Sequence, residues 1–240
     1  MELVETGVEG LDAILNGGIA RRAAVLVSGR PGTGKSILGL QYLYNGVEQF
    51  DERGIYLSFE ESERDIREAA ESIGFENWAE HVENGDITVF DKRQLLQEDE
   101  FAGTLDTLMA ELDGGDYDRL VLDSLTMFGL FFDTEREKRT YLLKFVDVLK
   151  EFGLTSLLVA EQSEAFPTAG GVSLENFLTD GNIFMLQTPT EAGVNRYLWV
   201  SKMRKQEIQT DIFPMEITQG GIAVYERAAG FSLIGGNPIT

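Results

Sequence analysis

Short apolar runs alternate along the chain with longer segments in which apolar residues recur roughly every three to four positions. Such runs, bounded by glycine or charged residues, are typical of strands buried on both faces of a parallel sheet. We expect strands at residues 23–28, 55–59, 87–90, 120–123 and 155–160. The periodic segments predict helices at residues 37–50, 62–73, 101–112 and 134–152. The alternation predicts an α/β fold with a mainly parallel central sheet, helices on both faces and the strand at 23–28 in the centre.

The pattern changes after residue 182, where strands follow each other closely without helices between them. These strands are expected at residues 183–186, 196–203, 214–218 and 222–225. Gly220 and Gly221 provide the turn before the last of them, so an antiparallel extension should complete the sheet. The chain shows no internal repeat, low-complexity tract or linker. We therefore expect one domain over residues 1–228 and a C-terminal tail over residues 229–240.

Acidic residues are spread along the whole chain among the apolar segments. The 240 residues include 41 Asp and Glu against 20 Lys and Arg, which gives a formal net charge of −21. A disordered acidic tail would concentrate this charge in one block. Dispersed acid with few lysines fits a protein that works in molar salt, where screening mutes the repulsion between carboxylates. We interpret the host as a halophile, such as a haloarchaeon; the alternative is an ordinary acidic cytosolic protein.

Composition also excludes several kinds of site. The chain has no cysteine, so it has neither a disulfide framework nor a thiolate metal site, and its single histidine, His81, is expected on the surface. The first residues do not resemble a signal peptide, and no stretch approaches about 18 consecutive apolar residues. We expect a cytoplasmic protein without membrane insertion. The acidic surface disfavours nonspecific binding to nucleic acid.

Residues 29–36 fit the Walker A pattern G-x-x-x-x-G-K-[ST] at every fixed position. They lie between an expected strand and an expected helix, so backbone N–H groups and the helix N-terminus can hold the phosphates of ATP. Lys35 supplies a positive charge, and the Ser36 hydroxyl is a suitable ligand for Mg²⁺. The alternative is a glycine-rich turn with an incidental lysine. The residues expected to bind the nucleotide are Gly29, Arg30, Pro31, Gly32, Thr33, Gly34, Lys35, Ser36 and Ile37.

Carboxylates follow two of the expected strands. Asp123 ends an apolar strand, and ligands of α/β sheets bind at the carboxyl ends of the strands, so we interpret Asp123 as the Walker B aspartate and a second Mg²⁺ ligand. Glu60 and Glu61 follow the strand at 55–59, where one of them can orient and deprotonate the attacking water. Alternatively, Asp123 only caps the turn that follows its strand, and the two glutamates only form the acidic first turn of the next helix.

Five motifs occur along the chain in the order seen in KaiC-like ATPases. They lie at residues 6–12, 29–36, 59–61, 121–124 and 201–204. The chain therefore resembles this family, within the wider RecA and RadA group, over roughly residues 3–226. The resemblance implies a RecA-like P-loop NTPase fold and a hexameric ring with ATP between the subunits.

The resemblance also implies roles for four charged side chains. Glu60 would be the general base with Glu61 as its partner, while Lys202 and Arg204 would reach the γ-phosphate bound by the neighbouring subunit. A cation offered from the next subunit stabilises charge in the transition state and couples hydrolysis to assembly. The alternative for Lys202 and Arg204 is a pair of solvated charges on a strand face.

The chain departs from the family pattern in three places. The clock protein of the family has two such domains in tandem, whereas this chain matches one, so only the ATPase module carries over. The clock protein's second domain has an adjacent serine and threonine that are phosphorylated, but residues 173–179 contain no adjacent hydroxyl pair, so self-phosphorylation is not expected. Ile208 stands near the place where the family often has a histidine.

The sequence thus favours a slow ATPase that acts as a nucleotide-driven switch and signals to an unidentified protein partner. A second hypothesis is an ATP-binding regulator or motor accessory that barely hydrolyses ATP. A third is a RadA-type recombinase, which would need a basic groove for single-stranded DNA. Residues 163–171 contain no lysine or arginine, so this third hypothesis is disfavoured.

Overall fold

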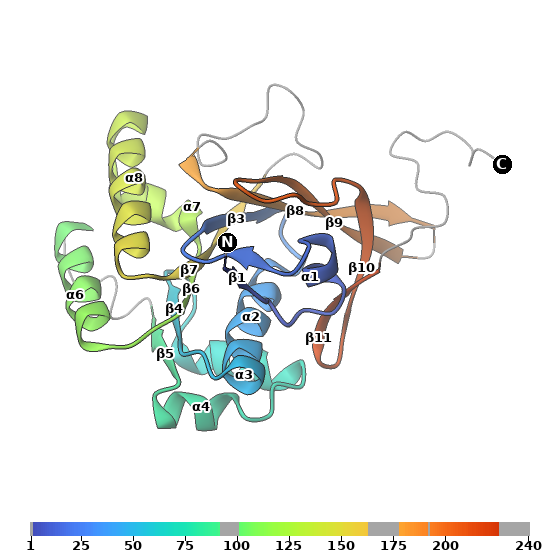
Figure 1. The fold of residues 1–240 in the computed structure, drawn as a ribbon, viewed down its shortest axis with the longest axis horizontal. Helices are drawn as coiled ribbons and strands as arrows, with labels where there is room; N and C mark the ends of the chain where they lie inside the picture. The colour runs from blue at the N-terminus through green and yellow to red at the C-terminus, as the bar shows by residue number, and fades with distance from the viewer. Residues whose placement is uncertain (1, 92–100, 163–177, 192, 226–240) are drawn as a thin grey trace.

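The computed structural model describes residues 2–91, 101–162, 178–191 and 193–225. One large sheet dominates it, with the strand order β11-β10-β9-β8-β3-β7-β6-β4-β5 (Figure 1). Its strands are β3 (Ala24–Gly29), β4 (Gly54–Ser58), β5 (Ile87–Phe90), β6 (Arg119–Asp123), β7 (Thr155–Glu161), β8 (Gly181–Thr190), β9 (Gly193–Met203), β10 (Ile212–Thr218) and β11 (Gly221–Val224). A small second sheet pairs β1 (Leu3–Val4) with β2 (Ile19–Ala20).

The central strands are parallel, as the sequence predicts. β8, β3, β7, β6, β4 and β5 run in one direction, and every residue of β3 is buried. β9, β10 and β11 follow as antiparallel strands. The predicted α/β fold, with β3 in the middle and an antiparallel C-terminal extension, is therefore confirmed.

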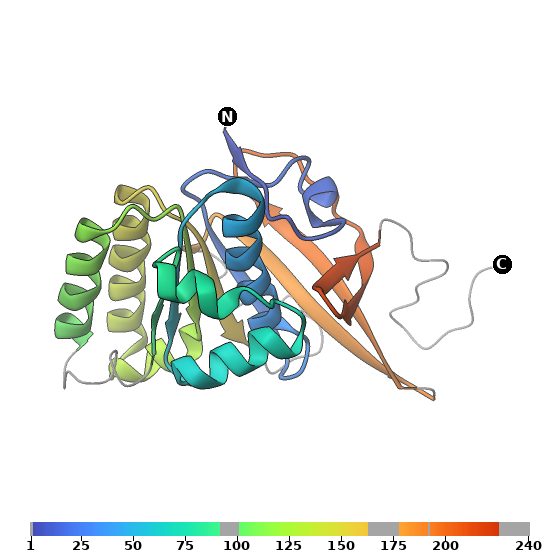
Figure 2. The same cartoon turned by 90° about the horizontal axis from the view of Figure 1, so that it is seen from below.

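Helices cover both faces of the sheet (Figures 1 and 2). The longer ones are α2 (Lys35–Phe50), α3 (Glu63–Ser72), α4 (Trp78–Asn84), α6 (Phe101–Gly114) and α8 (Glu135–Glu151). One buried cluster joins α2, α3 and α4 to the side chains of β3 at Val25 and Val27. The other joins α6 and α8 to the alternate side chains of β3, Ala24 and Leu26. The alternation of side chains along a strand thus assigns each helix to one face.

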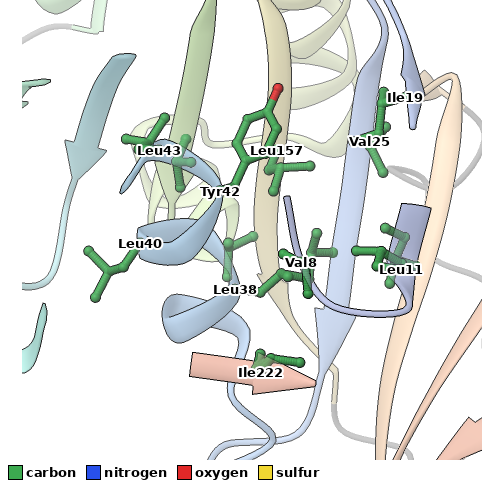
Figure 3. Packing of buried hydrophobic residues seen from close by; sticks show 14 of the residues in the cluster. Val8, Leu11, Ile19, Val25, Leu38, Leu40, Tyr42, Leu43, Leu157 and Ile222 are labelled. Carbon is green, nitrogen blue, oxygen red and sulfur yellow. The ribbon is translucent and has the colours of Figure 1, made fainter. Parts of the chain in front are cut away.

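The face that carries α2 is closely packed (Figure 3). Leu38 and Tyr42 of α2 belong to the same buried cluster as Val25 of β3 and Leu157 of β7. The Tyr42 hydroxyl donates a hydrogen bond to the carbonyl of Thr155, 3.1 Å away, so its polar end is satisfied. This packing fixes α2, and with it the loop that precedes the helix, against the centre of the sheet.

Two helices begin at capping residues that the sequence makes visible. Ser62 accepts from the backbone N–H of Asp65, whose side chain accepts from the Ser62 N–H in return. Ser62 is therefore the N-cap of α3. Thr134 and Glu137 make the same capping box at the start of α8.

The strands β8 and β9 are longer than the sequence predicts. Their pairing continues to Thr190 and Gly193, although the apolar pattern of β8 ends at Leu186. The outer residues are exposed and pair only with each other, so no buried face imposes a pattern on them. Figure 2 shows this ribbon extending away from the rest of the sheet.

The sequence also misses the short elements and misplaces one side chain. The missed elements are β1, β2, α1 (Leu11–Ile14), α4, α7 (Leu125–Phe128) and the 3₁₀ turn η1 (Gly129–Phe131). Most are too short for a hydrophobic period to develop. The expectation of a surface His81 is wrong: its side chain is only 14% exposed and its Nε2 lies 2.8 Å from a Glu48 oxygen, because α4 packs it against α2.

Arg119 is a buried cation at the start of β6. Its side chain is fully buried and binds the Glu52 carboxylate at 2.6 Å. It also donates to the carbonyls of Tyr42 and Glu5 and lies over the rings of Tyr42 and Phe50. A buried charge is tolerated only when it is paired and hydrogen-bonded, and this arginine is both. It ties the N-terminal segment to α2 and the sheet.

Candidate active site

The Walker A residues 29–36 connect β3 to α2 at the centre of the sheet, and we call this segment the phosphate loop. Gly32 and Gly34 have φ angles of 80° and 101°, which other residues adopt only at a cost. A Cβ on Gly29 would clash with the carbonyl oxygen of Met185, so this strand end is too crowded for a side chain. The glycines of the Walker A pattern are therefore required by the local backbone.

Lys35 is the first residue of α2 and is almost fully buried. Its ammonium donates to the carbonyl of Arg30, 3.2 Å away, and so folds back over the loop. Burial lowers the pKa of Lys35, while the nearby carboxylates of Glu161, Asp123 and Glu60 oppose the fall. The Lys35 ammonium thus lies near several carboxylates. The phosphates of a bound nucleotide would compete with these carboxylates for the ammonium.

Asp123 lies where the sequence places it, at the carboxyl end of β6. The Tyr56 hydroxyl donates to its carboxylate at 2.9 Å, and Ser36 makes a second hydrogen bond to it. Burial raises the pKa of Asp123, although both hydrogen bonds oppose the rise. The structure therefore joins Lys35, Ser36 and Asp123 in one cluster.

Glu60 and Glu61 follow β4 and are both exposed. The Ser124 hydroxyl donates to Glu60 at 2.6 Å, which brings this glutamate beside Asp123. Glu60 is among the charges that act on both Lys35 and Asp123. Glu61 has its backbone N–H bonded to the Ser58 hydroxyl at 2.9 Å, and its charge acts on Tyr56. Glu60 is the member of the pair that faces the phosphate loop's lysine.

Glu161 is a fourth carboxylate, which the sequence patterns above did not identify. It ends β7, the strand between β3 and β6, and pairs in register with Gly29. Val159 and Val121 face α2, so strand alternation turns Glu161 and Asp123 to that same face. The signal was available, because Glu161 ends a buried strand as Asp123 does.

Two further residues reach the phosphate loop from the antiparallel strands. Gln187 of β8 donates to the Pro31 carbonyl and Arg196 of β9 donates to the Gly32 carbonyl, each at 3.3 Å. They are 156 and 164 residues away from those loop positions in the chain. Only the pairing of β8 with β3 and β9 brings them close, so no local pattern could have identified them.

Lys202 and Arg204 lie at the opposite end of the sheet from the phosphate loop. Lys202 pairs with Asn182, which pairs with Leu26 near the start of β3, whereas the loop begins at Gly29. The Lys202 ammonium donates to the Thr179 carbonyl at 2.7 Å, and burial lowers the pKa of Lys202. The structure does not bring these two cations to the loop of their own subunit.

The residues of the cluster fit a magnesium–nucleotide complex. The Ser36 hydroxyl and the Asp123 carboxylate are hard oxygen donors that already contact each other, and Mg²⁺ takes few protein ligands. Among the described residues, no group of three or more His, Cys, Asp or Glu could hold a metal ion by itself. An ion at this place would therefore depend on phosphate and water for its remaining ligands.

The family model described as "ATPase: KaiC" matches residues 4–229. The chain belongs to the KaiC ATPase family. The circadian clock oscillator protein KaiC of Synechococcus elongatus is 30% identical over 233 residues, which are 94% of this chain and 44% of that protein. KaiC 1 of Synechocystis is also 30% identical, over 95% of this chain and 45% of its own length. This KaiC-family chain thus spans less than half the length of these curated relatives.

A solved structure of similar size has the same fold. The KaiC-like protein from the hyperthermophilic archaeon Pyrococcus horikoshii aligns with a TM-score of 0.82 and 29% identity, over 93% of this chain and 99% of the other. The predicted RecA-like, KaiC-like architecture is therefore confirmed. Among the described residues, the KaiC-family chain has no helix that is both long enough and apolar enough to span a membrane.

Proposed function

We propose that the chain is a single-domain, magnesium-dependent ATPase, with the domain over residues 1–228. The observation that carries the proposal is the cluster of Lys35, Ser36, Asp123 and Glu60 at the carboxyl ends of β3, β6 and β4. Ligands of open α/β sheets bind at this end of the strands. Membership of the KaiC ATPase family supports the same activity.

Each residue of the cluster has a proposed role. The backbone of residues 29–36 and the start of α2 hold the phosphates, and Lys35 leaves the Arg30 carbonyl to bind them. Ser36 and Asp123 would hold Mg²⁺, which when bound neutralises charge on the phosphates. Glu60 accepts the proton of the attacking water, and Ser124 keeps its carboxylate in place. Glu61 supports Glu60 from the adjacent position.

We propose that the active form is a hexameric ring. Lys202 and Arg204 lie at the amino end of the sheet, remote from their own phosphate loop, which suits a role in the site of a neighbouring subunit. A cation that arrives only on assembly makes hydrolysis depend on the ring. The nucleotide state of the ring would then be the signal that a cytoplasmic protein partner reads.

Hydrolysis and assembly are tested together on one preparation. Wild type is incubated with ATP in molar KCl, with Mg²⁺ or with EDTA, and passed through size exclusion before phosphate release is measured. A large assembly that hydrolyses ATP only with Mg²⁺ supports the proposal. If the protein stays monomeric and binds ATP without hydrolysing it, the result favours the alternative hypothesis of an ATP-binding regulator.

Two predictions fall on residues outside those that the structure describes. Residues 163–171 bear on DNA binding, and residues 173–177 bear on self-phosphorylation.

We propose further that the protein is halophilic. Its formal net charge of −21 is distributed over the whole chain, so the carboxylates repel each other wherever screening is weak. We expect the wild type to lose its native circular dichroism at ~0.1 M KCl, where the Debye length is about 10 Å, and to regain it at ~2 M. Retention of the native spectrum and of a sharp thermal transition at low salt contradicts this interpretation.

A further inference from the structure

Asp180 is fixed at the amino end of the sheet, one residue before β8. Its backbone N–H donates to the Ala24 carbonyl at 2.8 Å, and its carboxylate accepts from the Ala24 N–H at 3.1 Å. Its side chain is 17% exposed. The carboxylate therefore has a defined place at the start of β3, the strand that leads to the phosphate loop.

Two cations from different elements meet on this carboxylate. Lys150, in the last turn of α8, places its ammonium 2.7 Å from Oδ2, and the guanidinium of Arg204 lies 3.5 Å from Oδ1. Burial by itself would raise the pKa of Asp180, but the hydrogen bonds from Lys150 and Ala24 and the two positive charges hold the pKa below its ordinary value. Asp180 is thus an ionised anchor between α8 and the chain after β9.

The residues of this anchor also hold the backbone around Arg204. The Arg204 N–H donates to the Asp180 carbonyl at 2.8 Å, and the Lys202 ammonium donates to the Thr179 carbonyl at 2.7 Å. The adjacent residues Thr179 and Asp180 therefore contact both basic residues proposed to serve the neighbouring subunit. No motif in the sequence assigns Asp180 a role.

We propose that Asp180 is a positioning residue that aims Arg204 at the nucleotide of the neighbouring subunit. The inference rests on the proposed ring ATPase. The Arg204 side chain is half exposed, so without a tether it would sample many rotamers. Its contact with Asp180 is long, and Lys150 already balances the charge of the carboxylate. The guanidinium is therefore directed by a carboxylate whose negative charge it shares with Lys150.

The first test replaces Asp180 with asparagine, which keeps the acceptor for the Ala24 N–H but removes the charge. We expect kcat to fall roughly 10- to 100-fold, as misplacement of a catalytic group does, while KM for ATP and ring formation stay unchanged. Asp86→Asn is the matched control, because Asp86 also contacts a basic side chain, His81, at the same end of the sheet. The control should retain wild-type kcat.

The second test asks whether the defect acts on the neighbour. Asp180→Asn and Glu60→Gln chains, distinguished by two tags, are co-expressed so that mixed rings form. Where an Asp180→Asn subunit holds ATP and a Glu60→Gln subunit supplies Arg204, the shared site is wild type in all its parts. Random mixing should restore about one quarter of wild-type activity, because one in four contacts has this composition. A folding defect that spreads to the phosphate loop of the Asp180→Asn chain gives no such recovery.

A parallel mixture of Arg204→Ala with Glu60→Gln separates the two proposals. Recovery in this mixture without recovery in the Asp180 mixture overturns the role of Asp180 and leaves the ring ATPase standing. Recovery in neither mixture overturns the shared site itself. Unchanged or raised kcat in Asp180→Asn also overturns the inference. If Asp180→Asn does not assemble, Lys150→Met carries both tests: of the two cations described on Asp180 it leaves only Arg204, which the carboxylate then neutralises more fully, so kcat should fall several-fold.

Discussion

Replacing Arg204 with alanine is expected to lower kcat by about 10³-fold or more, the usual effect of removing an arginine that contacts a transferring phosphoryl group. ATP binding by each subunit should survive, because Arg204 lies at the end of the sheet opposite its own phosphate loop. Phosphate release by the variant, measured beside nucleotide binding by filter retention, checks both statements. The loss should appear in kcat rather than in KM.

The control for Arg204→Ala is Lys205→Ala, which removes an adjacent exposed cation from the same turn. It should keep wild-type turnover, because no side-chain contact within the described residues joins Lys205 to Asp180. Equal losses in the two variants would show that general surface charge, rather than the guanidinium of Arg204, supports turnover. Full activity of Arg204→Ala would contradict the shared site.

Replacing Glu60 with glutamine is expected to reduce hydrolysis by roughly 10²- to 10⁴-fold, the contribution of a general base. Glutamine has nearly the same shape and still accepts the hydrogen bond from Ser124, so ATP binding and ring assembly should remain. Single-turnover hydrolysis of radiolabelled ATP in assembled rings measures the effect on the chemical step.

Glu61→Gln is the companion variant for this prediction. The charge of Glu60 acts on Lys35, Asp123 and Tyr56, and that of Glu61 acts on Tyr56, so the loss should be smaller at Glu61. A larger loss at Glu61 than at Glu60 would exchange the proposed roles of the two glutamates. Loss of nucleotide binding in either variant would show a structural contribution instead.

The parallel core and the phosphate loop could be predicted because their signals are local. A strand buried on both faces is a continuous apolar run, as in β3, and the Walker A glycines, Lys35 and Ser36 are neighbours in the chain. Asp123 ends such a run and was found for the same reason. These features depend on burial and backbone geometry that each segment carries by itself.

The rest of the site depends on strand register, which the sequence does not display. Gln187 and Arg196 reach the loop only because β8 pairs with both β3 and β9. Asp180 acquires two cations from α8 and from the end of β9, elements far apart in the chain. The extended ribbon of β8 and β9 was underestimated because exposed strands that pair only with each other need no apolar pattern.

The position of Arg204 at one end of the sheet and of the phosphate loop at the other limits the assemblies that the proposed mechanism allows. In the proposed ring, Arg204 of one subunit meets the phosphate loop of the next, so the contact joins two different surfaces and runs head to tail. An open row of subunits always leaves one phosphate loop without an Arg204 from a neighbour, and one Arg204 without a phosphate loop to contact. Only a closed ring completes as many sites as it has subunits, so turnover per subunit should rise with assembly and become constant when the ring closes.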